Sequence, residues 1–446
     1  MRTVITYGTF DLFHEGHRRL LERARELGDR LIVGVTTDTY DRTRGKLNVA
    51  QSVLERIDNV KQTGLADQVL VEEYDGQKIH DIQKWDVDVF AIGSDWAGKF
   101  DYLKDYCEVV YLDRTRGVSS TQLRNDTVGI LRLGLMGAGP KAEALVVEAR
   151  YVSGISVEAV WDSDAEEARS LAERMELARV EDTYERLLKN VDAVFVSTSA
   201  GSRAELIRLA LERGVNVLSE APISLTVAET TSLLGLARDR RLALVDGIRT
   251  AYSPGFLRMV AYARSGSIGR IRSVEATMTR LSYAGPARDA ADGGAIAELA
   301  AYPLLAVIKL LGADYEGLTC HVLKPEGSPV DLFARIDLRY REAVASVKVG
   351  IGVRAEGDLE VAGSNGSLYV PAPWWRTQHF ETRFEDPQEN QGFFVRYEGE
   401  GIRYELAELA SRVRGSTKRS YKVRNADSIT VARIIEQARS TGTVFG

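Results

Sequence analysis

Short apolar segments alternate with amphipathic helical segments twice over in this chain of 446 residues, and this alternation limits the fold more than any other feature. The first series begins with TVITYG at residues 3–8 and ends with EVVYLDR at 108–114. The second begins with ILRLGLMGAG at 130–139 and ends with VNVLSEAP at 215–222. Strands that alternate with helices at this spacing pair in parallel, so the sequence predicts two separate three-layer α/β units.

The sequence changes character after about residue 250, where long segments alternate between apolar and polar residues. Examples are IRSVEATMTRLSY at 271–283 and GDLEVAGSNGSLYVP at 357–371. Such alternation is typical of an antiparallel sheet with one packed face. We therefore expect an α/β protein in which two Rossmann-like, doubly wound parallel-sheet domains precede an α+β domain with a mostly antiparallel sheet. The expected domain ranges are 1–127, 128–250 and 251–446.

The charge balance and the apolar runs indicate which kinds of partner to expect. The formal net charge is −6 at pH 7, which gives no electrostatic reason to expect nucleic acid or an anionic membrane. No apolar run reaches the roughly 18 residues that span a bilayer, and the first residues lack the layout of a signal peptide. Cys107 and Cys320 lie far apart and do not suggest a disulfide framework. We expect a cytoplasmic protein with small-molecule partners.

The stretch GTFDLFHEGH at residues 8–17 joins the first predicted strand to the first predicted helix. At the carboxyl end of a parallel strand, backbone N–H groups and a helix N-terminus form a natural anion site. Imidazolium donors from His14 and His17 would stabilise charge that grows on an α-phosphate. A zinc pair and histidines incidental to a helix start are the alternatives. A zinc pair needs further ligands, for which the first domain offers His80 and Cys107 besides.

Three separated motifs resemble one enzyme family in the same order. GTFDLFHEGH matches the HxGH signature of the nucleotidyltransferase superfamily, and RTRGVSST at 114–121 resembles its second signature, RTxGxST. The segment GSDWAGKFDYLKDYCEVVYL at 93–112 narrows the resemblance to glycerol-3-phosphate cytidylyltransferases, and the likeness covers residues 1–127. It implies in-line attack of an alcohol phosphate on the α-phosphorus of CTP, with Mg²⁺ and release of pyrophosphate.

The same resemblance assigns roles to individual residues. It gives catalytic roles to His14, His17, Lys46 and Arg114. It gives nucleotide contacts to Gly8, Thr9, Phe10, Asp11, Gly16, Asp95, Thr115, Ser119, Ser120 and Thr121. Two positions depart from the family pattern, because Ser94 replaces a second aspartate and a basic residue near Gly64 is missing. Arg56 and Lys61, on one predicted helix, are candidates to replace that basic residue, and the identity of the acceptor stays open.

A second nucleotide motif lies in GLMGAGPKAEAL, where Gly137, Gly139 and Ala142 form a G-x-G-x-x-A pattern between a strand and a helix. Asp162 follows at the end of the next strand, where a carboxylate would meet an adenosine ribose. Such an aspartate favours NAD over NADP because it repels a 2′-phosphate, although Ser163 and Arg169 keep NADP open. The predicted cofactor-binding residues are Gly137, Ala138, Gly139, Asp162, Ser197, Thr198 and Glu220.

The rest of the chain, from residue 128 to 446, resembles the Gfo/Idh/MocA oxidoreductases. The likeness rests on DAVFVSTSAGSRAELIRLALERGVNVLSEAPISLTVAE at 192–229 and on DGGAIAELAAYPLLAVIKLLG at 292–312. It implies catalytic roles for Glu298 and for Tyr302, which would protonate a carbonyl oxygen during hydride delivery. The family's Glu-Lys-Pro lysine is replaced by Ala221. Other cations, such as Arg249 or Arg203, are candidates to replace it, and the alternative is a domain without redox turnover.

Together the two halves predict a bifunctional enzyme. The reductase would make a polyol phosphate from a sugar phosphate, and the transferase would activate glycerol 3-phosphate or a related polyol phosphate as a CDP-alcohol for teichoic-acid-like or capsular polymers. The alternative is a monofunctional cytidylyltransferase whose second half is redox-inactive and serves oligomerisation or dinucleotide sensing. Both resemblances imply a homo-oligomer, a dimer or higher.

Overall fold

The computed structural model describes residues 1–11, 13–37, 51–74, 76–113, 130–281, 292–415 and 420–445. The chain divides into two compact units. The first comprises residues 1–131 and 150–156, and the second comprises residues 132–149 and 157–446. No helix among the described residues is both long enough and apolar enough to cross a lipid bilayer.

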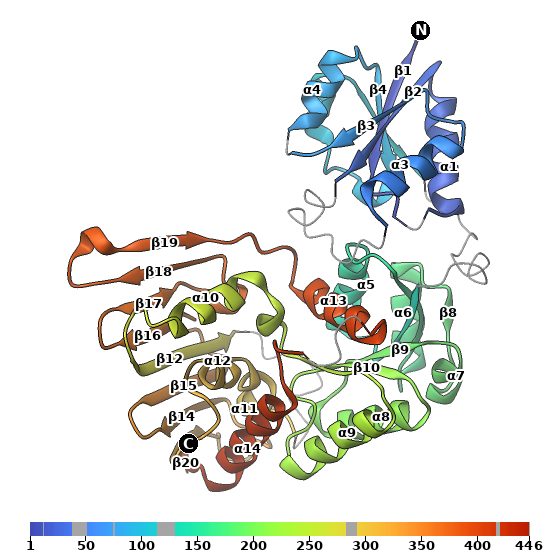
Figure 1. The fold of residues 1–446 in the computed structure, drawn as a ribbon. Coiled ribbons are helices and arrows are strands. Elements are labelled where there is room, and N and C mark those ends of the chain that lie inside the picture. The colour runs from blue at the N-terminus through green and yellow to red at the C-terminus, as the bar shows by residue number, and fades with distance from the viewer. Residues whose placement is uncertain are drawn as a thin grey trace. The chain divides into compact units, whose positions relative to one another are not determined.

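The first unit contains a five-stranded parallel sheet in the order β3-β2-β1-β4-β5 (Figure 1). Its strands are β1 (Thr3–Gly8), β2 (Arg30–Thr36), β3 (Gln68–Glu72), β4 (Val89–Gly93) and β5 (Glu108–Leu112). Its helices are α1 (Glu15–Glu26), α3 (Val53–Gln62) and α4 (Gln77–Lys84), with short 3-10 helices at Ser94–Trp96 and Asp101–Asp105. The strand order reverses between β1 and β4, and ligands of open α/β sheets bind at such a switch point.

Two apolar cores, one on each face of this sheet, produce the three layers. Leu21 of α1 and Val60 of α3 pack with Val33 of β2 in one core. Ile82 of α4 packs with Ile32 of the same strand in the other. Because neighbouring residues of a strand point to opposite faces, a strand buried on both faces carries an unbroken apolar run, as β2 does.

The six-stranded second sheet has the order β11-β10-β9-β6-β7-β8, and its β10–β11, β9–β10, β6–β9 and β7–β8 pairs are parallel. Its strands are β6 (Leu131–Met136), β7 (Ile155–Trp161), β8 (Arg179–Val180), β9 (Ala193–Val196), β10 (Asn216–Glu220) and β11 (Leu244–Gly247). Its helices are α5 (Pro140–Ala149), α6 (Ala165–Met175), α7 (Tyr184–Lys189), α8 (Ala200–Glu212) and α9 (Val227–Asp239). Here the order reverses between β6 and β9.

A nine-stranded sheet follows, in the order β19-β18-β17-β16-β12-β15-β14-β13-β20. Its strands are β12 (Ile271–Arg280), β13 (Gly317–Leu323), β14 (Phe333–Arg339), β15 (Val344–Ile351), β16 (Leu359–Gly363), β17 (Ser367–Val370), β18 (His379–Arg383), β19 (Gln391–Phe394) and β20 (Thr443–Phe445). The helices of this part are α10 (Pro254–Arg264), α11 (Ala295–Leu299), α12 (Ala301–Leu311), α13 (Ile402–Val413) and α14 (Asn425–Thr441), with 3-10 helices at Arg249–Tyr252, Trp374–Arg376 and Pro387–Glu389.

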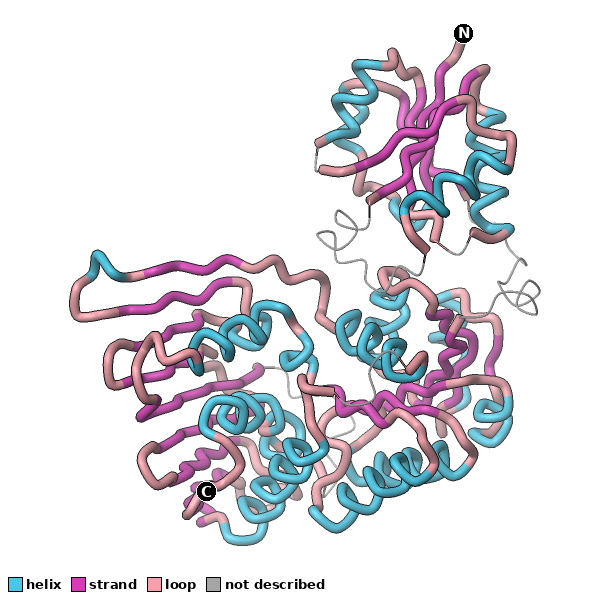
Figure 2. The backbone as a smooth tube through the Cα atoms, viewed as in Figure 1, coloured by secondary structure: helices cyan, strands magenta, loops and turns pink. Residues whose placement is uncertain are grey.

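The pairing of this sheet is mostly antiparallel, as predicted, and only the β12–β15 and β13–β20 pairs among the described strands are parallel. Helices α11, α12 and α14 pack against one face of it, and Figure 2 shows the strands and helices as separate layers. The predicted fold class is therefore confirmed.

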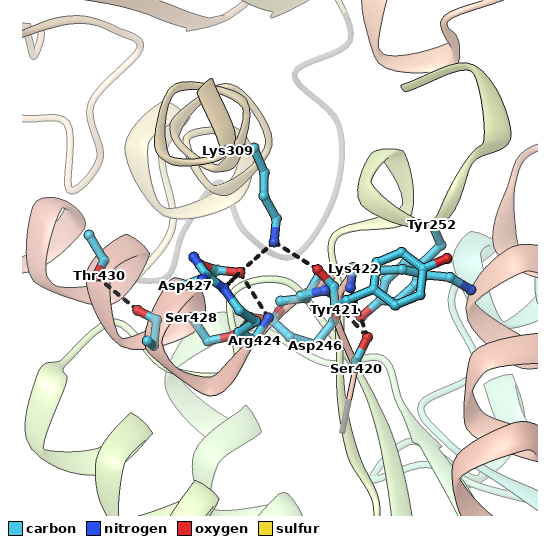
Figure 3. Close-up of polar contacts among 12 residues, drawn as sticks. Asp246, Tyr252, Lys309, Ser420, Tyr421, Lys422, Arg424, Asp427, Ser428 and Thr430 are labelled. Carbon is cyan, nitrogen blue, oxygen red and sulfur yellow. Dashed lines mark hydrogen bonds and ion pairs between the residues drawn. The ribbon is translucent and has the colours of Figure 1, made fainter. Parts of the chain in front are cut away.

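Polar contacts tie helix α14 to α12 and to β11 (Figure 3). Lys309 of α12 donates to the Asp427 carboxylate, with Nζ 2.6 Å from Oδ2. Ser428, the next residue, donates to Asp246 of β11 at 2.7 Å. The Asp427 side chain is 1 % exposed and that of Lys309 is 10 % exposed, so this ion pair is shielded from water. Helix α14 therefore fixes α12, which carries Tyr302 in its first turn, relative to the Rossmann sheet.

We predict that Lys309→Met lowers the free energy of unfolding by roughly 2 kcal/mol, because the buried Asp427 carboxylate loses a charged hydrogen bond but keeps its ion pair with Arg424. Chemical denaturation of the full chain, followed by circular dichroism, measures the loss. Arg238→Met is the control, because the ion pair between Arg238 and Asp239 is exposed (side chains 75 % and 68 %). Its loss is expected below about 1 kcal/mol. Equal losses in the two variants would contradict a special role for the buried pair.

Candidate active sites

The first site lies where β1 ends and α1 begins. His14 is the N-cap of α1, and its Nδ1 accepts a hydrogen bond from the Gly16 backbone N–H at 3.0 Å. This bond leaves the proton of a neutral His14 ring on Nε2, as a donor. In this arrangement His14 can donate a hydrogen bond from Nε2 to a ligand.

His17 stands one turn further along α1 and stacks on His14. The ring centroids are 4.0 Å apart and the planes are inclined by 21°. Phe10 meets His17 edge-on at 5.5 Å, and Phe13 lies at the same distance in a tilted arrangement. The two histidines form one aromatic surface at the N-terminus of a helix, where backbone N–H groups favour an anion.

The structure changes the predicted roles of two residues of this stretch. Phe10 is 1 % exposed, so its side chain supports His17 from the core and its backbone is the part that can meet a nucleotide. A Cβ on Gly16 would lie 2.9 Å from Cε1 of His14. Gly16 therefore makes room for the capping imidazole, whereas the sequence suggested that it makes room for a ligand.

Arg56 holds the loops beside the histidines in place. Its side chain is fully buried, and NH1 donates to the Thr9 carbonyl at 2.7 Å and to the Thr36 carbonyl at 2.9 Å. Asp11 accepts a hydrogen bond from the Gln51 backbone N–H at 2.9 Å. The expectation that Arg56 replaces the missing basic residue for the acceptor phosphate is wrong, because its guanidinium is committed to backbone carbonyls in the core.

The other predicted residues of the first site are only partly described. Gly8 is the last residue of β1, where a Cβ would come within 3.0 Å of the Phe10 ring. Asp95 belongs to the 3-10 helix that follows β4, the strand next to β1. Lys46, Arg114, Thr115, Ser119, Ser120 and Thr121 lie outside the described residues. The sequence analysis did not predict a buried cluster of four polar side chains between β1, β3 and α4. In this cluster Tyr7 donates to Asp81 at 2.9 Å, and Lys78 pairs with Glu72.

The second site begins with the glycine loop after β6. Gly137 has a φ of +113°, and a Cβ there would lie 2.0 Å from the Ser197 carbonyl oxygen, so only glycine fits. At Gly139 the space around a Cβ is open, which allows close approach of a ligand. The Ala138 N–H donates to Asp162 at 2.7 Å, so this carboxylate lies beside the loop at the end of β7. The loop geometry fits a dinucleotide.

Glu220 lies at the centre of the remaining predicted cofactor residues. Its carboxylate accepts from Ser197 at 2.5 Å and pairs with Lys141 at 2.5 Å and Arg203 at 3.4 Å. Burial acts to raise the pKa of Glu220, but Lys141 and Arg203 lower the pKa below its usual value, so the group is ionised. The Thr198 hydroxyl is buried without a hydrogen-bond partner among the described residues, as expected of a group that meets a ligand.

Glu298 and Tyr302 lie four residues apart in the consecutive helices α11 and α12. Glu298 pairs with Arg280 at the end of β12. Tyr302 is 6 % exposed, and charge interaction with Tyr302 is the main cause of a raised pKa of Arg249. Arg249 belongs to the 3-10 helix after β11 and also donates to the Glu400 carbonyl at 3.3 Å. Ala221 is 4 % exposed and adds no charge.

A buried carboxyl from α13 completes this cluster. Glu405 is 4 % exposed, and burial raises its pKa to about 8, although Arg249 and Lys141 oppose the increase. Sequence reasoning missed Glu405, because it lies more than a hundred residues from the motifs that it approaches. Burial likewise raises the pKa of Asp246 to about 6. At neutral pH the Glu405 carboxyl is therefore mostly protonated.

The raised pKa of Glu405 predicts a pH-dependent stability. The folded chain keeps this proton up to about pH 8, whereas the unfolded chain loses it near 4.5, so folding is favoured less as pH rises between these values. In this pH range the free energy of unfolding of the wild type should fall with a slope of up to about 1.4 kcal/mol per pH unit because of Glu405, and Glu405→Gln should remove this contribution. Denaturant titrations of the full chain at several pH values measure the slope. The exposed Glu385→Gln is the control, and equal slopes in wild type and Glu405→Gln would contradict the prediction.

Comparison with known proteins assigns the two sites to families. A cytidylyltransferase-like family model matches residues 5–127. Glycerol-3-phosphate cytidylyltransferase of Bacillus spizizenii is 51 % identical over 135 residues, which are 29 % of this chain and 100 % of that enzyme. The chain belongs to the cytidylyltransferase-like family. The same enzyme of Staphylococcus aureus is 46 % identical to the cytidylyltransferase domain over 129 residues, covering 29 % of this chain and 97 % of that enzyme.

The rest of the chain matches oxidoreductases. The oxidoreductase family with an NAD-binding Rossmann fold matches residues 131–247, and the GFO/IDH/MocA C-terminal domain matches 256–369. dTDP-3,4-didehydro-2,6-dideoxy-alpha-D-glucose 3-reductase of Streptomyces violaceoruber is 32 % identical over 200 residues, which are 42 % of this chain and 57 % of that enzyme. A 3-ketoreductase of Actinomadura kijaniata, solved with NADP and TDP-benzene, shares the fold with a TM-score of 0.64 and 23 % identity, over 71 % of this chain and 99 % of that one.

These matches support a fused bifunctional enzyme. A cytidylyltransferase domain comes first, and an NAD(P)-dependent oxidoreductase of the Gfo/Idh/MocA family follows it. The recognition of both families from the sequence is confirmed.

Proposed function

We propose that the cytidylyltransferase domain transfers a cytidylyl group from CTP to glycerol 3-phosphate or a related polyol phosphate. The stacked pair His14 and His17, at the N-terminus of α1, carries this proposal. An acceptor phosphate oxygen attacks the α-phosphorus of CTP, a new P–O bond forms, and the bond to the bridging oxygen breaks as pyrophosphate leaves. The histidine N–H groups stabilise the charge that grows on the α-phosphate oxygens.

Mg²⁺ would accompany the triphosphate of CTP. Within the described ranges, no three His, Cys, Asp or Glu side chains lie close enough together to hold a metal ion. Mg²⁺ commonly binds through substrate phosphates and water with one or two carboxylates, so a preformed protein cage is not required. When bound, Mg²⁺ neutralises part of the triphosphate charge, while the chain contributes helix N–H groups and the histidines.

We propose further that the oxidoreductase half makes the polyol phosphate from a keto or aldo sugar phosphate. Reduced nicotinamide, when bound, supplies a hydride to the carbonyl carbon. Tyr302 donates its hydroxyl proton to the carbonyl oxygen, and the resulting phenolate regains a proton from solvent. Gly137, Ala138, Gly139 and Asp162 are the residues that would hold the dinucleotide, and Ser197, Thr198 and Glu220 lie at the adjacent β9 and β10 strand ends.

An acceptor screen tests the first proposal. Full-length protein, CTP and Mg²⁺ are mixed in turn with glycerol 3-phosphate, ribitol 5-phosphate and erythritol 4-phosphate, and pyrophosphate release is followed. We expect one of these acceptors to be strongly preferred, and glycerol 3-phosphate would place CDP-glycerol and polymer synthesis downstream. Absence of release with every polyol phosphate would overturn the proposal.

A parallel assay follows NADH and NADPH absorbance with dihydroxyacetone phosphate and ribulose 5-phosphate, whose reduction yields glycerol 3-phosphate and a pentitol phosphate. We expect turnover with the carbonyl precursor of the preferred acceptor. If the chain binds NADH but none of the carbonyl compounds causes NADH oxidation, the result would favour the alternative, a redox-inactive half that serves oligomerisation. Sedimentation of the same protein tests the proposed homodimer or higher oligomer.

A further inference from the structure

The carboxylate that is expected to meet the adenosine ribose is fixed by three hydrogen bonds from its own chain. Oδ2 of Asp162 accepts from the Ala138 backbone N–H of the glycine loop at 2.7 Å. Oδ1 accepts from the Asp164 backbone N–H at 2.9 Å and from the Ser163 hydroxyl at 3.2 Å. A carboxylate has roughly four acceptor positions, so Oδ2 keeps one that suits a ribose hydroxyl.

A second carboxylate occupies the start of α6. Asp164 is the N-cap of this helix, and its Oδ1 accepts from the backbone N–H groups of Glu166 at 2.9 Å and Glu167 at 3.3 Å. A phosphate binds at a helix start through backbone N–H groups of this kind. Here the chain's own carboxylates accept from them, and Glu166 and Glu167 add two exposed carboxylates in the first turn. The β7–α6 turn therefore carries negative charge and is poorly suited to a phosphate.

Ser163 and Arg169 are the two residues that keep NADP open in the sequence, and both are directed elsewhere. Ser163 donates its hydroxyl proton to Asp162. The other arginine of α6, Arg174, faces α5 and pairs with Glu143 there at 3.0 Å. Because a helix turns by about 100° per residue, Arg169 points about 140° away from Arg174. The exposed Arg169 thus lies on the flank of α6 that is turned away from α5 and the glycine loop.

We propose that the reductase half binds NAD(H) and rejects NADP(H), and that Asp162 and Asp164 determine this choice. The inference rests on the proposed dinucleotide binding of the reductase half. A 2′-hydroxyl can donate to the open position on Oδ2 of Asp162. A 2′-phosphate has no proton to donate when it is ionised, and it would face two carboxylates that hydrogen bonds hold in place. The 3-ketoreductase of similar fold was solved with NADP, so the likeness in fold does not give this preference.

Titration of the full chain with NADH and with NADPH, followed by nicotinamide fluorescence, tests this choice without any catalytic turnover. We expect the Kd of NADPH to exceed the Kd of NADH by at least about a hundredfold at low salt, because opposed like charges weaken binding strongly. Salt screens such repulsion, so the ratio of the two constants should fall as the ionic strength rises.

Asp162→Asn and Asp164→Ser remove the two charges with small changes of shape. Asparagine keeps one carbonyl acceptor, and serine is also a favourable N-cap, so α6 should stay capped. We expect each variant to bind NADPH more tightly than the wild type does and to lower the ratio about tenfold, and the double variant to approach equal affinities. Arg169→Ala should leave the ratio unchanged. The matched control is Asp182→Asn, which removes an exposed carboxylate of the same domain that pairs with Arg186 at 2.8 Å; both constants should stay near wild type.

Several outcomes would overturn the inference. They are a wild type that binds NADPH as tightly as NADH, a ratio that salt does not change, a selective loss of NADPH binding in Arg169→Ala, and aspartate variants that weaken both cofactors equally. A wild-type chain that binds neither NADH nor NADPH would overturn the proposed dinucleotide binding and this inference together. A wild type that binds NADPH tightly and reduces a carbonyl substrate with it would overturn this inference alone.

Discussion

His17→Ala should lower cytidylyl transfer about a thousandfold, because it removes a donor that we propose stabilises the charge developing on the α-phosphate. Its ring is held between His14 and the aromatic side chains Phe10 and Phe13. This packing fixes the ring before the substrate arrives, so no ordering is required during the reaction. Pyrophosphate release with saturating CTP and the preferred polyol phosphate measures the effect.

His17 is a better probe than His14. His14 caps α1, so His14→Ala also costs roughly 1 kcal/mol of helix stability and confuses folding with catalysis. His80→Ala, on the exposed side of α4, is the matched control and should keep transfer near wild type. NADH binding should be unchanged in all three variants. Transfer in His17→Ala within a few fold of wild type would contradict the proposed role of the pair.

Tyr302→Phe is expected to lower carbonyl reduction about a thousandfold, because general acid catalysis commonly contributes factors of this size. The change removes one oxygen atom and keeps the ring that packs in α12, so NADH binding and unfolding should stay close to wild type. Stopped-flow absorbance at saturating NADH measures the rate of the chemical step.

A second tyrosine provides the control for this variant. The Tyr315 hydroxyl donates to Gln437 at 3.0 Å, so Tyr315→Phe also removes one hydroxyl and one hydrogen bond from the same unit. It should leave kcat unchanged. Equal effects of the two substitutions would mean that Tyr302 supports the fold and does not donate the proton. Cytidylyl transfer should be normal in both variants.

Local signals along the sequence were sufficient to predict the sheets and the two loops that begin the sites. Each parallel strand needs an apolar run, and each first helix follows a glycine-containing turn, so the relevant residues are neighbours in the chain. Gly137 illustrates this, because the requirement for a positive φ and for close approach to Ser197 appears directly as a glycine motif. GTFDLFHEGH likewise places both histidines one helical turn apart.

Sequence reasoning failed where a side chain serves the backbone of another segment. Arg56 was expected to face a phosphate, yet it is fully buried and donates to the carbonyls of Thr9 and Thr36. The capping hydrogen bond from the Gly16 N–H to Nδ1 of His14 was also not predicted. The local sequence does not show whether a basic residue on a helix faces solvent or donates to carbonyls of distant segments. Only the folded backbone decides which acceptors its side chain can reach.

By itself, the sequence determined the fold class, both enzyme families and the absence of a lysine beside Pro222. Only the tertiary structure decided which charged groups surround the buried Glu405 carboxyl. Arg249, Tyr302 and Glu405 come from a 3-10 helix after β11, from α12 and from α13, and their separations in sequence carry no distance information. Charge interactions depend on separation in space and on burial. Packing of α13 on the Rossmann sheet, and of α12 on the nine-stranded sheet, therefore sets the electrostatics of the reductase site.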